Sequence, residues 1–344
     1  MQPLRTVSAA YLAAGLTCLL AQFLGAAEAG NGWSAVIRPP APQQVHSRAA
    51  PVRKDLTALV PFWTAPFPYH GNIAGTDEPF LNVNEDGRLG HRTPFGRLYW
   101  EDETYSDNRV LLHIPKGFDP KKPSVMIVFF HGHGATLTRD VLRRQRVPAQ
   151  ITASGVNAVL VAPQLAFDAS DSSVGKFSEP GAFGRFIGEA AQALAELHGD
   201  LNTARTFASM PIVIVAYSGG YKAAAWSATR GGLIKRVRGV VLLDALYGDL
   251  DKFASWISAD RSAFFVSTYL GSTEAKNAKL EQVLADRSVD IDTELESRLE
   301  PGSVTIFPGA TGSTTKVTHR DLVTRAWTYY PLADLLQRMR GYRR

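Results

Sequence analysis

Residues 213–226 read VIVAYSGGYKAAAW, and this stretch decides the fold. An apolar run typical of a buried strand stops at Ser218, between small residues, and continues as good helix formers. A sharp turn from strand to helix holds a serine Oγ clear of the backbone and beside a base, as a nucleophilic serine requires. Such a turn needs small residues two positions before and after the serine, where Ala216 and Gly220 stand. Ala216 departs from the usual Gly-x-Ser-x-Gly by one methyl group, and an ordinary Ser-Gly-Gly turn is the alternative.

A glycine-rich loop follows another apolar strand upstream. Residues 125–136 read VMIVFFHGHGAT, a strand of buried type that runs into closely spaced glycines. When an acyl carbonyl is attacked, its oxygen becomes an oxyanion, and such a loop can point backbone N–H groups at it. The Gly132-x-Gly134 pair lacks the third glycine of a dinucleotide-binding loop, since Leu137 stands there. We therefore expect an oxyanion loop rather than a plain strand-to-helix connection.

The positions of the histidines leave one candidate base. Of the eight histidines, only His319 follows Ser218 in the chain. Residues 303–307 before it read as a last strand, and residues 322–339 after it read as a closing helical region that Pro331 divides. A serine nucleophile, then an acid, then a histidine is a chain order found in one hydrolytic architecture. A lone surface histidine is the alternative.

With these motifs the chain resembles the α/β-hydrolase superfamily over roughly residues 97–340. The resemblance implies a central, mostly parallel sheet flanked by helices on both faces, a Ser-His-acid triad and an oxyanion hole. Carried over by position, Ser218 is the expected nucleophile and His319 the general base and acid. The backbone N–H groups of His133 and Gly219 are the expected oxyanion donors.

The acid of the triad is less clearly marked. Family members most often place it after the strand that corresponds to residues 263–271, and that loop offers only Glu274. The preceding strand ends directly on Asp244, and a carboxylate at the end of a buried strand must be paired or hydrogen-bonded to offset its desolvation. We prefer Asp244, with Glu274 second and Asp249 or Asp251 third. An N-cap of a following helix is the alternative role for Asp244.

Residues 1–29 read as a cleavable secretory signal peptide. Arg5 gives a positive start, residues 7–24 are apolar, and an Ala-x-Ala site precedes Gly30. We therefore expect a secreted or periplasmic protein without a stable membrane span after cleavage. A retained anchor is the alternative, because the apolar stretch is near the lower length limit of a spanning helix.

Cysteine content and composition restrict the chemistry further. The only cysteine, Cys18, lies within the signal segment, so the mature chain would have no disulfides, no thiol catalysis and no cysteine-bound zinc. A content of 45% hydrophobic and 20% charged residues is ordinary for a globular chain that buries its own core.

No cofactor and no metal are expected. Zinc-binding pairs such as His-x-x-x-His and phosphate-binding Walker loops are absent from the sequence, and His131 and His133 are better explained by the oxyanion loop, which His131 shapes. The net charge of +5 is mild, and its two clusters, 143–146 and 338–344, read as exposed helix faces or tail. We therefore expect no nucleic-acid partner. The oligomeric state is left open.

We expect one large domain, residues 69–344, after a Pro/Ala-rich linker or irregular arm over residues 30–68. Residues 96–101 and 109–115 read as the opening antiparallel strands of its sheet, and the loop 168–180 should overhang the rim that carries the serine. Aromatic residues mark the N-terminal part, and they either pack on the body or line a substrate cleft: Trp63, Phe67, Tyr69, Phe80 and Phe95.

These patterns together predict a secreted serine hydrolase that cleaves a carboxylic ester, less favourably an amide, through an acyl-enzyme. The substrate would be a small-molecule or polymer-linked ester, and acyl transfer to an acceptor other than water would use the same residues. The alternative from another class is a non-catalytic protein of hydrolase fold that binds a cell-envelope component. The altered elbow at Ala216 and the uncertain acid keep that alternative open.

Overall fold

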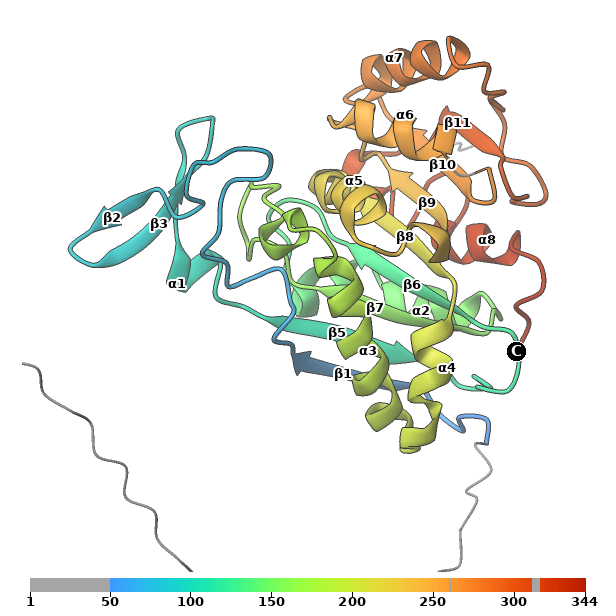
Figure 1. Cartoon of the computed structure of the whole chain (residues 1–344). Coiled ribbons are helices and arrows are strands. Elements are labelled where there is room, and N and C mark those ends of the chain that lie inside the picture. Colours follow the sequence, from blue (N-terminus) through green and yellow to red (C-terminus); the bar gives the residue numbers. More distant parts are fainter. Residues whose placement is uncertain (1–49, 260, 311–315) are drawn as a thin grey trace, which may run out of the picture. The chain divides into compact units, whose positions relative to one another are not determined.

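A computed structural model describes residues 50–259, 261–310 and 316–344 of the chain (Figure 1). Within this part an 8-stranded sheet has the order β1-β5-β7-β6-β8-β9-β10-β11. In that order its strands are Leu56–Pro61, Arg109–Ile114, Ala158–Pro163, Val125–Phe130, Ile212–Tyr217, Val237–Leu243, Phe264–Tyr269 and Val304–Pro308. β5 pairs antiparallel with both its neighbours, and the remaining pairs are parallel.

Helices cover both faces of this sheet. The α-helices are α1 (Glu101–Thr104), α2 (Val147–Ala153), α3 (Ala182–His198), α4 (Ala204–Ser209), α5 (Tyr221–Arg230), α6 (Leu250–Ala259), α7 (Glu274–Ala285) and α8 (Pro331–Gln337). A π-helical segment, η1, spans Leu137–Arg144. Short 3-10 turns are η2 (Gly175–Ser178), η3 (Leu201–Thr203), η4 (Ser218–Gly220), η5 (Ile234–Arg236) and η6 (His319–Asp321).

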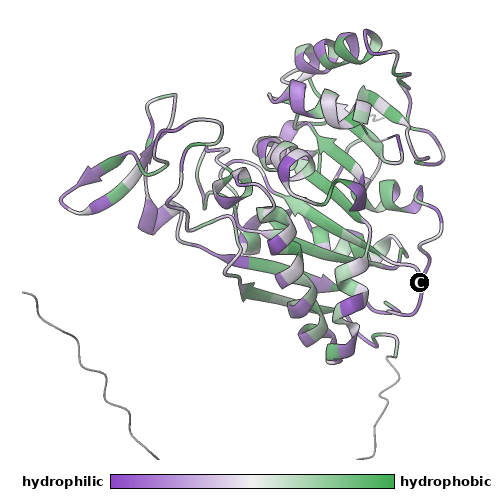
Figure 2. Cartoon of the chain, in the orientation of Figure 1, coloured by the Kyte–Doolittle hydropathy of each residue, from purple (hydrophilic) through white to green (hydrophobic). Residues whose placement is uncertain are grey.

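Successive side chains of a strand point to opposite faces of the sheet, so the strands contribute to two hydrophobic cores, one on each face. In β6 the side chains of Met126, Val128 and Phe130 join one core, and those of Ile127 and Phe129 join the other. The first core contains buried residues of α3 to α7, and the second contains those of η1, α2 and α8. Because both faces are covered, the central strands are apolar along their whole length, as the hydropathy colouring shows (Figure 2). The predicted α/β-hydrolase fold is confirmed by this architecture.

The predicted start of the domain at residue 69 is wrong. Strand β1, Leu56–Pro61, lies in the stretch read as a linker, yet it pairs antiparallel with β5 over its whole length. β1 is an edge strand with no fully buried residue, so it lacks the continuous apolar run that marks a buried strand. Residues 30–49 of the expected linker and the signal segment lie outside the described residues.

A smaller sheet stands beside the main one. Its strands are β2 (Val83–Glu85), β3 (Arg88–Arg92) and β4 (Leu98–Trp100), and β2 and β3 extend away from the central sheet (Figure 1, left). The predicted strand over residues 96–101 is therefore not an opening strand of the main sheet, whereas the one over 109–115 is β5. A third, separate buried cluster, against which Tyr99 of β4 packs, consists of Phe67, Tyr69, Phe80, Tyr105, Ala166 and Ala169.

The predicted C-terminal helical region begins later than expected because of proline. Residues 322–339 were expected to form helix on both sides of Pro331, but helix α8 begins at Pro331 itself. Proline is favoured in the first turn of a helix, where its missing N–H has no intrahelical partner. Likewise α2 contains Pro148 in its first turn, and it begins directly after Arg146, whose φ is 53°.

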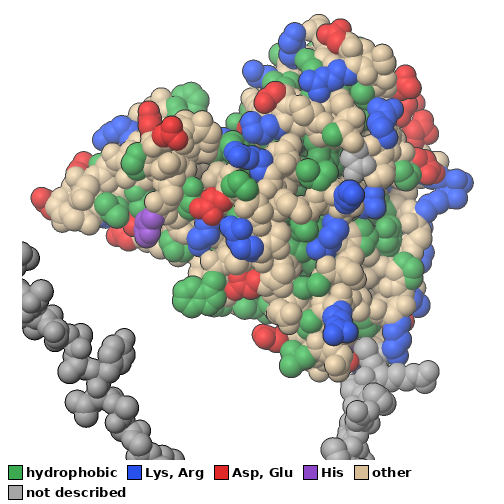
Figure 3. Space-filling model, viewed as in Figure 1, with side chains coloured by type: hydrophobic (Ala, Val, Ile, Leu, Met, Phe, Trp, Pro, Cys, Tyr) green, Lys and Arg blue, Asp and Glu red, His purple; other side chains and the backbone are tan. Residues whose placement is uncertain are grey.

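The described residues contain no helix that is long and apolar enough to cross a membrane. On the face seen in Figure 3, Lys and Arg side chains are scattered among acidic and apolar ones rather than gathered in one patch. No group of three or more potential metal-binding side chains occurs within residues 50–259, 261–310 and 316–344.

Candidate active site

The predicted serine turn is present at the end of β8. Ser218 has a φ of 51°, and α5 begins at Tyr221. A Cβ at Gly220 would lie 2.5 Å from the carbonyl oxygen of Phe130, so that position requires glycine. Ala216, in contrast, is accommodated, since it lies in β8 between β6 and β9 and is fully buried in the first core. The extra methyl at this position is therefore compatible with the sharp turn.

Ser218, His319 and Asp244 form one hydrogen-bonded chain. His319 Nε2 lies 2.9 Å from Ser218 Oγ, and His319 Nδ1 lies 2.6 Å from Asp244 Oδ2. Ser218 follows β8, Asp244 follows the neighbouring strand β9, and His319 stands in the loop after β11. The side chain of Asp244 is 0% exposed and that of His319 is 38% exposed, so the imidazole is accessible to solvent while the carboxylate is not.

Asp244 is held by groups from the segment after β10. The backbone N–H of Leu270 donates to Oδ1 at 3.1 Å, Ser272 Oγ donates to Oδ2 at 3.2 Å, and Thr273 Oγ1 donates to Oδ1. Burial alone would raise the pKa of Asp244, but hydrogen bonds from His319, Thr273 and Leu270 outweigh it and hold this pKa below its usual value. The carboxylate is thus kept ionised.

The other candidate acids lie elsewhere. Glu274 is the exposed first residue of α7, and it makes no hydrogen bond to His319 within the described residues. Asp249 and Asp251 both lie near the Lys252 ammonium, at 2.9 Å and 3.7 Å. Asp244 does not cap a helix, since the next one, α6, begins only at Leu250.

Tyr217 orients the histidine, and the sequence analysis did not identify it. Its ring stacks on the His319 imidazole with centroids 5.0 Å apart, and its hydroxyl donates to the His319 carbonyl oxygen at 3.0 Å. The ring of Tyr247 meets the imidazole edge-on, with centroids 6.4 Å apart. These contacts come from the residue next to Ser218 and from the loop after Asp244.

The glycine-rich loop after β6 packs against the serine. A Cβ at Gly132 would lie 2.7 Å from Ser218 Cβ, and one at Gly219 would lie 2.2 Å from the His133 ring. The two predicted oxyanion donors, His133 and Gly219, are therefore brought together beside Ser218. Within the described part of the chain the backbone N–H of His133 donates to no other group.

His131 shapes this loop from within. Its Nδ1 lies 2.9 Å from the carbonyl oxygen of Gly132, and its Nε2 accepts the backbone N–H of Leu165 at 2.9 Å. Complete burial lowers the pKa of His131 to about 4, which keeps the ring neutral and able to accept that hydrogen bond. His133 points to the loop 168–180, with Nε2 2.7 Å from Ser172 Oγ.

A cleft of about 480 Å³ opens beside Ser218. It lies between the serine turn with the start of α5 and the turn that joins β3 to β4, where Phe95 is 95% exposed. Its lining residues are Ile73, His91, Thr93, Pro94, Phe95, His133, Ser170, Asp171, Ser172, Ser173, Ser218, Gly219, Tyr221, Lys222 and Tyr247. The loop 168–180 thus reaches the rim as predicted, and of the N-terminal aromatic residues Phe95 lines the cleft while Phe67 and Phe80 are buried in packing.

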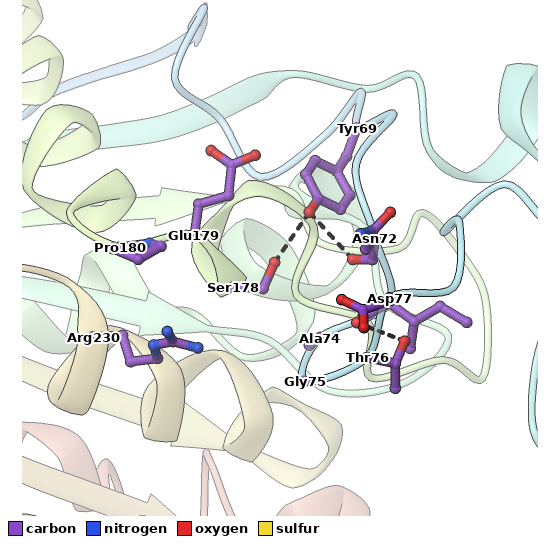
Figure 4. Close-up of a pocket in the computed structure, with 11 residues that line it drawn as sticks. Tyr69, Asn72, Ala74, Gly75, Thr76, Asp77, Ser178, Glu179, Pro180 and Arg230 are labelled. Carbon is purple, nitrogen blue, oxygen red and sulfur yellow. Dashed lines mark hydrogen bonds between the residues drawn. The ribbon is translucent and has the colours of Figure 1, made fainter.

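A second hollow of about 420 Å³ lies near this cleft. Figure 4 shows its polar lining, with Asp77 and Thr76 on one side and Arg230 on the other, and with Tyr69 bonded to Ser178 and Asn72. A small cavity of about 20 Å³ lies between the two, since it shares Ile73 with both of them. The triad residues do not line this second hollow.

Comparisons with known proteins give structural matches alone. No protein-family model and no curated protein matches the chain. A mutant of the feruloyl esterase module from Clostridium thermocellum, complexed with sinapinate, is 13% identical, with 79% of this chain and 94% of that chain covered and a TM-score of 0.42. An S-formylglutathione hydrolase from Agrobacterium tumefaciens is 10% identical over 74% and 97% of the two chains, with a TM-score of 0.38. Brefeldin A esterase is 13% identical over 74% and 77%, with a TM-score of 0.39.

Proposed function

We propose that this protein is a serine hydrolase that cleaves a carboxylic ester through an acyl-enzyme. The observation that carries the proposal is the continuous hydrogen-bonded chain from Ser218 Oγ through both ring nitrogens of His319 to the buried Asp244 carboxylate. A serine hydroxyl needs such a base to become nucleophilic, and the base needs an acceptor at its other nitrogen to fix its tautomer.

The reaction follows from these contacts. Ser218 Oγ attacks the ester carbonyl while His319 Nε2 takes the hydroxyl proton, and the Asp244 carboxylate stabilises the imidazolium that forms. The carbonyl oxygen becomes an oxyanion that the N–H groups of His133 and Gly219 stabilise. His319 then returns the proton to the departing alkoxide as the C–O bond breaks. A water molecule attacks the acyl-enzyme by the same proton transfers and releases the acid.

The ionised Asp244 supports catalysis over binding without turnover. A carboxylate that pointed away from His319 would have favoured a non-catalytic protein, but Asp244 accepts from Nδ1 at 2.6 Å and its remaining lone pairs are satisfied by Leu270, Ser272 and Thr273. Burying the Asp244 carboxylate costs desolvation free energy, and in return the carboxylate holds the His319 imidazole in one orientation.

The first experiment is labelling with a fluorophosphonate, because only an activated serine reacts quickly with this electrophile. We expect the probe on Ser218 by peptide mapping, and we expect His319→Ala to abolish labelling while the thermal unfolding curve stays cooperative. A panel of short-chain esters, with an amide of matched acyl group, then measures turnover. Folded protein that neither labels nor hydrolyses any ester would contradict the proposal.

We further propose that the protein is secreted or periplasmic. The support is the apolar N-terminal segment with its Ala-x-Ala site before Gly30. Expression of the full chain in a bacterial host, followed by N-terminal sequencing of the exported protein, should give a chain that starts near Gly30. Retention of residue 1 in the membrane fraction would show an uncleaved anchor instead.

A further inference from the structure

Lys222 lines the cleft beside Ser218, and its ammonium has no partner among the residues that the structure describes. It lines the cleft that contains Ser218 and also the small cavity that leads toward the second hollow. Its side chain is half-buried on α5, and within the described residues its ammonium makes no ion pair, no hydrogen bond and no stacking contact. A cation that is partly removed from water gains when a ligand supplies an anionic acceptor.

The neighbouring lysines differ in this respect. Lys252 forms an ion pair with Asp249 at 2.9 Å and lies over the Trp226 ring, and Lys176 donates to the carbonyl oxygen of Trp63 at 3.0 Å. Their charges are therefore satisfied by the protein. The ammonium of Lys222 is therefore available to pair with a ligand that enters the cleft.

The carboxylate and the histidines that line the cleft are already partnered. Asp171 is the one carboxylate among the lining residues, and its Oδ2 accepts from the Tyr105 hydroxyl at 2.9 Å rather than from Lys222. His91 is bonded to the carbonyl oxygen of Phe80 at 2.7 Å, and His133 to Ser172. Lys222 is thus the unpaired charge among the residues that line the described cleft.

We propose that the natural ester carries an anionic group, a carboxylate, sulfate or phosphate, that Lys222 binds while the carbonyl carbon lies at Ser218. This inference rests on the proposed function. Ser218 and Lys222 line the same cleft, and Lys222 stands in the first turn of α5, which begins just after the serine turn. One ligand in this cleft can therefore contact both residues.

Matched substrate pairs test the proposal and show on which side of the ester the anion lies. For the acyl side the pair is the 4-nitrophenyl ester of glutarate and that of monomethyl glutarate. For the leaving-group side it is the acetate ester of 3-hydroxybenzoate and that of its methyl ester. Each rate is divided by the uncatalysed rate, and the measured quantity is the ratio of kcat/KM for the anionic member over the neutral member.

We expect wild-type protein to favour the anionic member of one pair by about tenfold, the size of one charge-assisted contact in a partly exposed cleft. Lys222→Met should bring that ratio to about one, and Lys222→Arg should keep most of it. The matched control is Lys235→Met, because Lys235 is exposed in η5, directly before the amino end of β9, whereas Ser218 follows the carboxyl end of the parallel strand β8, and the loss of Lys235 changes net charge equally. Added salt should lower the ratio in wild type and leave it unchanged in Lys222→Met.

Two results would overturn the inference alone: equal hydrolysis of both members in both pairs, or a preference that survives in Lys222→Met. If no ester is hydrolysed and Ser218 resists the fluorophosphonate, the proposed function fails and the inference fails with it. A cooperative unfolding transition for each variant separates loss of binding from loss of fold.

Discussion

The ring of Tyr217 stacks on the imidazole of His319, with an interplanar angle of 24°, and its hydroxyl donates to the backbone carbonyl of the same histidine. Tyr217 is the last residue of β8, directly before Ser218. One strand end therefore fixes the nucleophile through the backbone and the base through a side chain. Tyr217 therefore ties the backbone and the ring of His319 to the strand end that carries Ser218.

Removing these contacts should slow the chemical step. Tyr217→Phe keeps the ring and loses the hydrogen bond to His319, for which we expect a drop in kcat of about fivefold, equivalent to about 1 kcal/mol. Tyr217→Leu also loses the stacking on the imidazole, so we expect a larger drop in kcat than in Tyr217→Phe. Steady-state kinetics on one neutral ester should place the effect in kcat, with KM little changed, because positioning of the base is lost rather than substrate binding. Wild-type kcat in Tyr217→Leu would refute the positioning role.

The identity of the acid can be tested by a pair of isosteric amides. Asp244→Asn keeps the shape but presents an amide to His319 Nδ1, which disfavours the catalytic tautomer, so we expect kcat to fall by about 10³ to 10⁴. Glu274→Gln is the matched control, since Glu274 is exposed at the start of α7, and we expect full activity. A large loss in Glu274→Gln, with activity retained in Asp244→Asn, would exchange their roles.

Close packing of the loop against the serine predicts a steric effect at Gly132. An alanine methyl there would lie 2.7 Å from Ser218 Cβ, so Gly132→Ala must displace either the serine or the oxyanion loop, and we expect a loss of about 10²-fold or more in kcat. Gly188→Ala is the control: no atom lies within 4 Å of a Cβ there, and this glycine is inside α3. We expect that variant to keep its activity and to gain about 0.5–1 kcal/mol in free energy of unfolding. Equal activity of both glycine variants would contradict the packing argument.

The positions of Ser218 and Asp244 could be predicted because each directly follows a strand that is buried on both faces. Such strands are continuous apolar runs, so their ends are visible in the sequence. β8 and β9 are neighbours in the sheet, and the carboxyl ends of parallel strands meet at one edge, which brings the two residues close. His319 was identified by its position in the chain order, without a structural pattern of its own.

Other parts of the site and fold could not be predicted because they depend on contacts between distant segments. Thr273 donates to Asp244 and Tyr217 stacks on His319, but a threonine in a loop and a tyrosine at a strand end have no distinguishing pattern. β1 was missed because an edge strand is half exposed, and the small sheet β2-β3-β4 because its strands have 3 to 5 residues. Strands this short carry too few residues for an alternation to be recognised.

Two buried histidines make the stability of the fold depend on pH. His113 lies in β5, with Nδ1 2.8 Å from Thr57 Oγ1 and Nε2 3.0 Å from Thr152 Oγ1, and His131 is the first residue of the glycine-rich loop after β6. Burial lowers the pKa of each from 6.5 to about 4. Both are therefore neutral in the folded protein at pH values where the unfolded chain binds a proton on each.

The sign of the effect follows from this difference. Below about pH 6.5 the unfolded state binds more protons, so the free energy of unfolding falls as pH decreases toward 4, by about 1.4 kcal/mol per pH unit for each histidine at most. His113→Gln removes one titrating group, and we expect the pH dependence between 6.5 and 4.5 to weaken by one proton, whatever its effect on stability at pH 7. Urea unfolding at several pH values measures this slope, and Lys235→Met, which touches no histidine, should keep the wild-type slope. An unchanged slope in His113→Gln would show that His113 is protonated in the folded protein, in conflict with its burial and its two hydroxyl partners.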